Sequence, residues 1–206
     1  MSATAEPRKV RKQREDGLRS RRTILDAAAK LATVEGLEGL SIGRLAEHIG
    51  MSKSGLYAHF GSKEELQLAT IETAAEIFQE HVIAPTEAIE SPRARLEGVT
   101  ESFLDHLERR VFPGGCFFAS AAAEFDTHPG PVKERIAAYS AEFLETLEEL
   151  ADEAQREGEL GAGQDPGQVA FEIDAYLLMA NTAFLLHNDP KTLDRARAAI
   201  QARLGR

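Results

Sequence analysis

The stretch from Ser41 to Phe60 reads SIGRLAEHIGMSKSGLYAHF and decides how the N-terminal part of the chain folds. Its first half spaces apolar side chains at i, i+3, i+4 and i+7, as on one face of a helix, at Ile42, Leu45, Ala46 and Ile49. Ser41 is suited to cap this helix, and Gly50 is suited to end it. After the three-residue turn 50–52, a short helix is expected from Lys53 to Phe60, with Ser52 as its cap. Two helices joined by such a glycine-containing turn are typical of a helix-turn-helix motif.

Helices are also predicted on both sides of the motif. Residues from about 20 to 35 place four apolar side chains on one face, at Ile24, Ala28, Leu31 and Ala32. After the motif, Ser62 and Glu65 have the spacing of a capping box and predict a further helix that stops before Pro85. We expect the motif to pack against Ile24 and Leu31 through Leu45, Ile49, Leu56 and Phe60.

The second helix of such a motif enters the major groove of DNA, while the first crosses the backbone. Its outward residues here are small, polar or polar-tipped, namely Lys53, Ser54, Gly55, Tyr57 and His59. A glycine inside a helix costs about 1 kcal/mol relative to alanine. Close approach of the Gly55 backbone to DNA would explain that cost, and a tolerated surface glycine is the alternative.

Lys63 stands at the start of a predicted helix, where the macrodipole disfavours a positive charge. A phosphate docked at this N-terminus would remove the conflict and would also use the helix's unpaired amides. We therefore expect Lys63 to hold a phosphate. The alternative is a solvated lysine offset by Glu64 and Glu65.

Charge is divided unevenly along the chain. The formal net charge is −10, which by itself is unusual for a DNA-binding protein. Residues 1–63, however, contain 12 Lys or Arg and 7 Asp or Glu, a net charge of +5, whereas residues 64–206 contain 12 and 27, a net charge of −15. Because charges are screened within about 10 Å at moderate salt, a basic head can bind phosphates beside an acidic body.

Composition limits the class of protein. Hydrophobic residues make up 43% of the chain and charged residues 28%, which is typical of a soluble globular protein. The longest apolar-rich stretch, 175–186, has 12 residues, whereas a membrane-spanning helix needs about 20. No apolar segment follows the basic N-terminus, so it does not have the form of a secretory signal. We expect a cytoplasmic protein with no membrane span.

The periodicity predicts an all-α fold, with an N-terminal three-helix helix-turn-helix domain and a larger C-terminal helical bundle. The expected parts are a flexible basic arm at 1–17, a DNA-binding domain at 18–65 with its motif at 41–60, and a ligand-binding and dimerisation domain at 66–206. The basic residues of the arm favour contact with phosphate, and a tail without function is the alternative. Helices of the bundle are expected at about 92–110, 116–125, 132–158, 166–187 and 190–204.

Several short segments together resemble the N-terminal domain of the TetR family of bacterial transcriptional regulators. They are ILDAA at 24–28, Leu31, Gly36, LSI at 40–42, LA at 45–46, GMS at 50–52, GLY at 55–57, HF at 59–60 and KEEL at 63–66. The resemblance spans about residues 18–65. It implies a homodimeric, all-helical repressor whose two heads enter successive major grooves of a palindromic operator in double-stranded DNA. It also implies that a small-molecule effector in the C-terminal domain releases the DNA.

Position by position, the resemblance assigns DNA contacts to nine residues. Base or groove contacts fall on Ser52, Lys53, Ser54 and Gly55, and phosphate contacts on Ser41, Arg44, Tyr57, His59 and Lys63. Many members of the family have two threonines where this chain has Ser41 and Ile42, which leaves one hydroxyl fewer for phosphate. For Tyr57 and His59, a structural role is the competing interpretation.

The body resembles the family only in its size and helical pattern. By that analogy, the helices at 166–187 and 190–204 form a four-helix dimer interface, with Tyr176, Leu177, Met179, Ala180 and Phe184 as candidates. A helix that is apolar all round must bury more than one face, and a central core helix of a monomer is the alternative. A ligand pocket would be lined by the middle helices, with Phe103, Leu107, Phe117, Phe118, Phe125, Tyr139 and Phe143 as candidates.

Other functions find less support in the sequence. The chain has no Gly-rich phosphate loop, no Gly-x-Ser-x-Gly elbow and no paired histidines on a helix face, so an all-helical enzyme is disfavoured. A DNA-binding protein without a ligand stays open and would need no pocket. Cys116 is either a redox sensor or a small buried hydrophobe, and a single cysteine excludes an intrachain disulfide. His106, His128 and His187 lack ligand spacing, so no metal or cofactor is expected.

Overall fold

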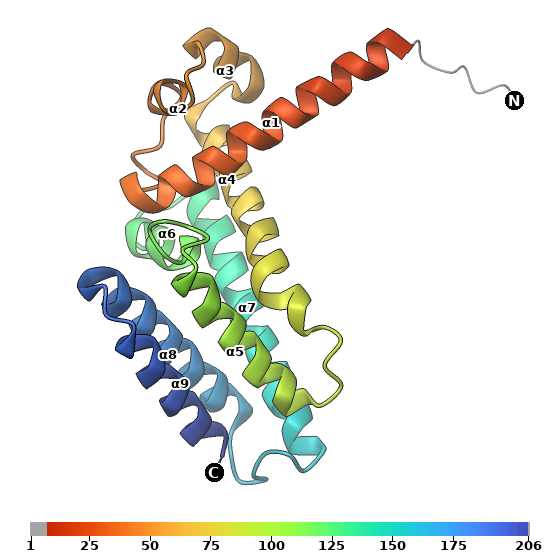
Figure 1. Cartoon of the computed structure of the whole chain (residues 1–206), viewed down its shortest axis with the longest axis vertical. Helices are drawn as coiled ribbons and strands as arrows, with labels where there is room; N and C mark the ends of the chain where they lie inside the picture. Colours follow the sequence, from red (N-terminus) through yellow and green to blue (C-terminus); the bar gives the residue numbers. More distant parts are fainter. Residues whose placement is uncertain (1–7, 206) are drawn as a thin grey trace, which may run out of the picture.

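The computed structural model describes residues 8–205, with side chains from Ser20 onward, and all of the regular structure in this part is helical. The elements are α1 (Arg8–Glu35), α2 (Ile42–Ile49), α3 (Lys53–Phe60), α4 (Lys63–Phe78), η1 (Gln79–Ile83), η2 (Ala84–Thr86), α5 (Pro92–Glu108), α6 (Phe117–Phe125), α7 (Pro131–Arg156), α8 (Pro166–His187) and α9 (Lys191–Leu204). Figure 1 shows α1, α2 and α3 grouped as a head at one end of a longer bundle. The expected all-α fold is confirmed.

The head has the caps and the packing that its sequence predicts. The Ser41 hydroxyl accepts a hydrogen bond from the Arg44 amide, and the Ser52 hydroxyl accepts one from the Gly55 amide. Gly50 ends α2 in the left-handed region at φ 68°, which residues other than glycine rarely adopt. One buried cluster joins the motif to the first helix through Ile24, Leu31, Leu45, Leu56 and Phe60.

The first helix is longer than the sequence predicts. We expected it to begin near Ser20, after a flexible arm, but α1 already begins at Arg8. The physical reason is composition, because residues 8–16 consist largely of Arg, Lys, Gln and Glu, which are good helix formers. Apolar periodicity does not reveal this part, because helix-forming composition does not require an apolar face. Residues 1–7 of the expected arm lie outside the described residues.

The body is a bundle whose second buried cluster is centred on α5, α7, α8 and α9. Its largest members are leucines, isoleucines and phenylalanines such as Leu96, Phe103, Leu147, Ile173 and Leu177. In Figure 1, α8 and α9 lie side by side along one flank of the bundle, next to α5. The head's cluster continues into the body through Phe112 and Phe117, so the two parts share a continuous packed boundary.

The helix α8 is more apolar than the 12-residue stretch 175–186 indicates. Counted as a whole helix of 22 residues, it is long and apolar enough by length and composition to cross a membrane, and it is the one such helix among the described residues. A core helix of a soluble protein passes the same test. The side chains of Val169, Ile173 and Leu177 are fully buried against the other helices of the body, which is the arrangement of a core helix.

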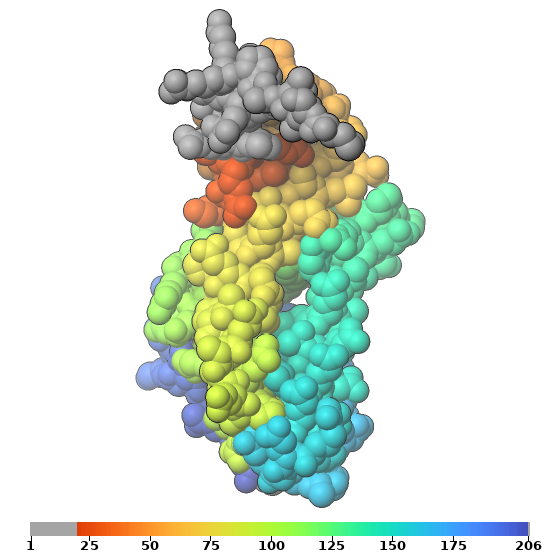
Figure 2. Space-filling model, turned by 90° about the vertical axis from the view of Figure 1, so that its right-hand side faces the viewer, coloured from red at the N-terminus to blue at the C-terminus, as the bar shows by residue number. Residues whose placement is uncertain are grey.

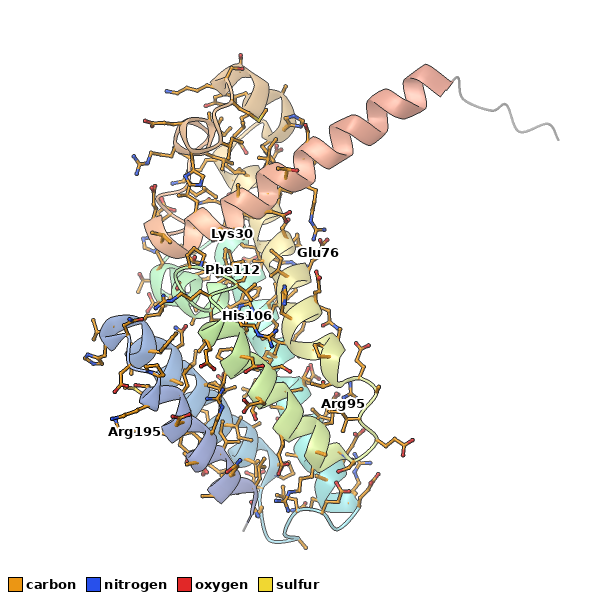
Figure 3. The ribbon with its side chains drawn as sticks, in the orientation of Figure 1. Lys30, Glu76, Arg95, His106, Phe112 and Arg195 are labelled. Atoms are coloured by element: carbon orange, nitrogen blue, oxygen red, sulfur yellow. The ribbon has the colours of Figure 1, made fainter. Side chains whose placement is uncertain are left out.

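His106 is a buried polar group without a polar partner. It lies in the interior of the body next to Phe112 (Figure 3), is 2% exposed, and neither of its ring nitrogens has a hydrogen-bond partner. Burial, assisted by the nearby charge of His81, lowers the pKa of His106 from 6.5 to about 4. The side chain is therefore neutral at neutral pH, and protonating it in the folded protein is unfavourable.

The pKa of His106 predicts an acid-dependent loss of stability. Because its folded pKa lies below its unfolded value, its contribution is intact above pH 6.5 and is lost as the pH falls toward about 4. Replacing His106 with Leu removes this titration, so between pH 7.5 and 4.5 the variant should lose about 2–3 kcal/mol less unfolding free energy than the parent. Urea unfolding at the two pH values measures the difference. The exposed His187→Gln variant should behave like the parent, and an equal loss in His106→Leu and the parent would contradict the assignment.

Candidate functional site

The outer surface of the helix-turn-helix presents the side chains that a major groove would meet. Lys53, Ser54 and Tyr57 are exposed, and Tyr57 retains 57% of its surface. Ser41 and Ser52 already serve as N-caps, although a hydroxyl that accepts from a backbone amide can still donate to a phosphate. The Ser52 and Ser54 hydroxyl oxygens lie 3.3 Å apart, and either hydroxyl can donate a hydrogen bond to the other. This surface thus offers several donors at the start of α3.

Gly55 has a structural reason to be glycine as well as the proposed close approach to DNA. A Cβ atom at this position would lie 3.1 Å from the Ser52 hydroxyl oxygen, which is tighter than an ordinary contact. That hydroxyl caps α3 by accepting from the Gly55 amide at 3.2 Å. A side chain here would press on the cap, so the glycine preserves the start of the second motif helix.

Two of the basic residues assigned to phosphate are held by glutamates. The Arg44 guanidinium donates to one carboxylate oxygen of Glu35 from Nε at 3.1 Å and from Nη2 at 2.8 Å. The Lys63 ammonium lies 2.9 Å from Glu38 Oε1, and this hydrogen bond is the largest contribution that lowers the pKa of Glu38. Exposed pairs of this kind are worth at most about 1 kcal/mol, so a phosphate can replace the carboxylate. The pairs hold both cations near the motif.

The side chain of Arg21 joins α1 to the backbone of His59 in α3. The Arg21 guanidinium donates to the His59 carbonyl at 2.5 Å and lies 4.5 Å from the centre of the Phe60 ring. Arg21 therefore positions the second motif helix by a charged hydrogen bond and a cation–π contact. Arg21 was not among the residues expected to have a role, because a basic residue near a terminus carries no signal for a tertiary contact.

A second candidate site is a cavity of about 1040 Å³ in the body. Figure 2 shows the hollow on one side of the molecule, between α4 and α7. Helices α4, α5, α6, α7 and α8 and the turn η1 all contribute to its lining. Of the aromatic residues expected there, four line it: Phe103, Phe118, Tyr139 and Phe143.

Three of the expected pocket residues lie elsewhere. Leu107, Phe117 and Phe125 are 1%, 2% and 6% exposed and pack in the hydrophobic clusters. They have the same helical spacing as the residues that line the cavity, but their side chains face the hydrophobic clusters instead. Spacing alone does not distinguish a cavity-lining residue from a core residue. The sequence analysis also missed Phe78 and Ile83, which line the cavity at the junction of α4 with the π-helical turn η1. Such turns often occur at functional sites.

A polar triad joins α4 to α7 at the edge of the cavity. Glu72 accepts hydrogen bonds from Arg135 Nε at 2.5 Å, Arg135 Nη2 at 2.8 Å and the Tyr139 hydroxyl at 2.6 Å. The bonds from Arg135 are the main cause of the lowered pKa of Glu72, while burial and Glu72 raise the pKa of Tyr139 to about 12. Glu72 and Tyr139 also line the cavity, so a ligand would touch this junction directly.

Cys116 borders the cavity but is a buried, protonated thiol. It is 3% exposed, and burial raises its pKa to about 11. Because the thiolate is the reactive form, these features support the interpretation as a small hydrophobe over the redox sensor. In the part of the chain that the structure describes, no group of three or more His, Cys, Asp or Glu residues is arranged to hold a metal ion.

Contacts at the loop after α1 connect the head to the body. Glu124, in the last turn of α6, accepts a hydrogen bond from the Leu37 amide at 2.7 Å, and Gln67 of α4 donates to the Leu37 carbonyl at 2.8 Å. Nearby, the Gly114 amide donates to the Thr33 hydroxyl at 3.1 Å. A Cβ at Gly114 would lie 1.8 Å from the Thr33 carbonyl oxygen, so only glycine permits this approach. Helices that line the cavity thus hold the head.

The candidate dimer residues on α8 divide into two groups. Leu177, Ala180 and Phe184 are at most 5% exposed and pack inside the chain's own core, so expecting them at an interface was wrong. Their burial follows from one face of the apolar helix turning inward. Tyr176 packs partly against the same core. Met179 is 63% exposed and lies on an outward face that it shares with other apolar residues, namely Phe171, Leu178 and Leu186.

Comparison with known proteins finds two family models that match this chain. The family model described as bacterial regulatory proteins, tetR family, matches residues 24–70. The model described as tetracyclin repressor-like, C-terminal domain, matches residues 92–200. Among similar proteins, the nucleoid occlusion factor SlmA of Marinobacter nauticus is 28% identical over 150 residues, which cover 73% of this chain and 73% of that protein.

Solved structures resemble nearly the whole chain. A TetR transcriptional regulator from Chloroflexus aurantiacus has a TM-score of 0.86 and 26% identity, over 93% of this chain and 97% of that one. The structure of AibR in complex with isovaleryl coenzyme A and operator DNA has a TM-score of 0.70 and 25% identity, over 90% of this chain and 96% of that one. One of these similar proteins therefore binds DNA and an acyl-CoA together.

The bond between Glu124 and Leu37 predicts a measurable link between α6 and the head. Replacing Glu124 with Ala leaves the Leu37 amide without its charged acceptor, which should destabilise the folded protein by about 1–2 kcal/mol. Hydrogen exchange at the Leu37 amide should become markedly faster, and urea unfolding should show the loss. Glu149→Ala, an exposed change on α7, serves as the control. Unchanged protection at Leu37 would show that the bond does not hold the loop.

Proposed function

This chain belongs to the TetR family of bacterial transcriptional regulators, and we propose that it is a repressor that a small molecule releases from its operator. It binds a palindromic operator in double-stranded DNA as a homodimer. The observation that carries the proposal is the capped helix-turn-helix, with Lys53, Ser54 and Tyr57 exposed at one end of a body that contains a large cavity. We further propose that it acts in the cytoplasm, and by binding rather than by catalysis.

Nine residues of the head are proposed to contact DNA. Ser52, Lys53, Ser54 and Gly55, at the start of α3, face the bases or the groove walls. Ser41, Arg44, Tyr57, His59 and Lys63 contact phosphates. The geometry supports this division, because the first set lies at the N-terminus of the recognition helix and the two cations of the second set are held by exposed pairs that a phosphate can replace. The proposed DNA-binding domain is residues 18–65.

The second copy of the chain is proposed to cover α8 and α9. Phe171, Leu178, Met179 and Leu186 expose between 41% and 74% of their surface along α8. On α9 the exposed positions include the small residues Ala198 and Ala202, which permit close approach of another helix. A two-fold pairing of these faces would bury the apolar stripe of α8 and form a four-helix interface.

Ligand release is proposed to act through α4 and α6. Both helices line the cavity, and both bond to Leu37 in the head through Gln67 and Glu124. A ligand that shifts either helix therefore moves the loop before the motif. Because the two recognition helices must match half-sites about 34 Å apart, a displacement of a few ångströms weakens operator binding.

Titration onto DNA tests the regulator proposal. The full chain should bind a fragment from next to its own gene with sequence specificity and with an affinity that falls steeply as salt rises. Electrophoretic mobility shift at several salt concentrations, against a scrambled fragment of equal length, measures both properties. Equal affinity for the scrambled fragment, or no salt dependence, would overturn the proposal.

Variants of the head separate phosphate contacts from base contacts. Lys63→Ala and Tyr57→Phe should weaken binding by about fivefold to tenfold for every sequence, whereas a Lys53→Ala change should also relax the base preference. Lys30→Ala, which removes an exposed lysine of α1 outside the motif, is the control. If all three variants kept the parent's affinity and preference, the assignments would be wrong.

A charge on the exposed face of α8 should prevent dimer formation. Met179→Glu places a carboxylate in the proposed interface, where burying it unpaired is unfavourable, so the dimer dissociation constant should rise at least about tenfold. Sedimentation velocity measures this constant. Ala141→Glu, which adds the same charge to an exposed position of α7, should leave the dimer unchanged. A Met179→Glu protein that dimerises like the parent would place the interface elsewhere.

A further inference from the structure

The cavity has a wall of aromatic rings. Phe78 makes edge contacts with Phe103, Phe118 and Phe143, with ring centres 6.1, 6.1 and 5.2 Å apart. Phe118 continues the wall to Tyr139 at 5.3 Å. Helices α4, α5, α6 and α7 each contribute a ring, so the wall surrounds the space from several sides. An aromatic wall of this size fits an apolar ligand, and ring faces carry partial negative charge.

The polar groups around this wall are all neutral or acidic. Five carboxylates line the cavity, from Glu72, Glu76, Glu80, Glu142 and Asp174, and no Lys, Arg or His appears among the lining residues in the described part of the chain. The body as a whole adds to this field, because residues 64–206 carry a net charge of −15. The charges of the lining therefore favour a cation over an anion inside the cavity.

These carboxylates differ in how well they are neutralised. Glu72 is paired with Arg135, and Glu76 is 2.5 Å from Arg22 Nη1. The carboxylates of Glu80, Glu142 and Asp174 have no hydrogen bond or ion pair among the described residues. Asp174 is half-buried beside Cys116, and the loss of hydration raises its pKa. A half-buried carboxylate without a partner gains most from a cation that enters the cavity.

We propose that the effector of this cavity is a lipophilic organic cation, with an aromatic or bulky apolar body and a protonated amine or quaternary centre. This inference rests on the proposed function and names the ligand class for the same site. The apolar body packs against the rings of Phe78, Phe103 and Phe118. The positive centre lies toward the carboxylates of Asp174 and Glu142 and receives cation–π stabilisation from the ring faces.

The same geometry disfavours an anionic ligand. The similar protein AibR binds isovaleryl coenzyme A, whose phosphates need basic or amide partners. The carboxylates of Glu80, Glu142 and Asp174, which have no cationic partner among the described residues, would repel such a ligand, and the lining contains no basic side chain that could bind its phosphates. This chain shares its fold with AibR, but its ligand is expected to carry the opposite charge to the ligand of AibR.

A pair of probes with one shape and opposite charge tests the inference. Tetraphenylphosphonium and tetraphenylborate both carry four phenyl groups around a central atom. The full chain should bind the phosphonium at least about tenfold more tightly than the borate, measured by isothermal titration calorimetry. Isovaleryl coenzyme A, as a third probe, should bind more weakly than the phosphonium. Tighter or equal binding of either anion, or no binding of any probe, would overturn the ligand class.

Carboxamide variants locate the charge effect. Asp174→Asn and Glu142→Gln should each lower the affinity for tetraphenylphosphonium by about threefold to tenfold. Glu145→Gln, which removes an exposed carboxylate of α7 that does not line the cavity, should not change it. Circular dichroism confirms that each variant is folded, and the rim variant Glu142→Gln keeps the test valid if Asp174→Asn does not fold. Unchanged affinity in both cavity variants would contradict the inference.

The experiment separates this inference from the regulator proposal. Operator binding without any probe is measured first, and its absence would overturn the regulator proposal alone. If the operator is bound, adding the phosphonium should release it, whereas the borate at equal concentration should not. An operator complex that neither responds to the phosphonium nor binds it would leave the regulator in place and overturn the ligand class.

Discussion

The backbone of Leu37 ties the loop before the helix-turn-helix of this transcriptional regulator to two helices of the body. Its amide donates to Glu124 of α6, and its carbonyl accepts from Gln67 of α4. The Leu37 side chain is 1% exposed, so its backbone groups depend on these partners rather than on water. The loop after α1 therefore takes its position from two helices of the body. Because α2 begins five residues later, the orientation of the motif depends on where α4 and α6 lie.

That dependence gives the cavity a physical route to the head. Phe118 and Phe78, on α6 and α4, line the cavity, and each helix also carries a group that bonds to Leu37. The triad of Glu72, Arg135 and Tyr139 ties α4 to α7 at the cavity's edge. A ligand changes the head only if it interacts differently with two arrangements of these helices. The hydrogen bonds of Leu37 and of the triad suit a change between two arrangements. In one arrangement each donor meets its protein acceptor, and in the other both groups bond to water instead.

Local chemistry made the head predictable, whereas the body depends on tertiary packing. Ser41, Ser52 and Gly50 act through neighbours within a few residues, so their roles follow from the sequence alone. Leu107 and Phe117 were expected in the pocket but lie in the core, because identical helical spacing serves both sides of a buried helix. The bond from Glu124 to Leu37 joins residues 87 positions apart. The one local feature that could have indicated this bond is the position of Glu124 in the last turn of α6, where the helix macrodipole disfavours an acidic residue.

The exposed ion pairs of the head bear on how the protein distinguishes its operator from other DNA. Glu35 and Glu38 hold Arg44 and Lys63, so under the proposed contacts each cation would leave a carboxylate to bind a phosphate. Each exchange of carboxylate for phosphate is nearly balanced, since an exposed pair is worth at most about 1 kcal/mol. Under the proposed assignment, Arg44 and Lys63 gain only the difference between a phosphate partner and the carboxylate partner that they leave. In the proposed complex, sequence selectivity would come from base contacts of α3 and from the simultaneous binding of two heads.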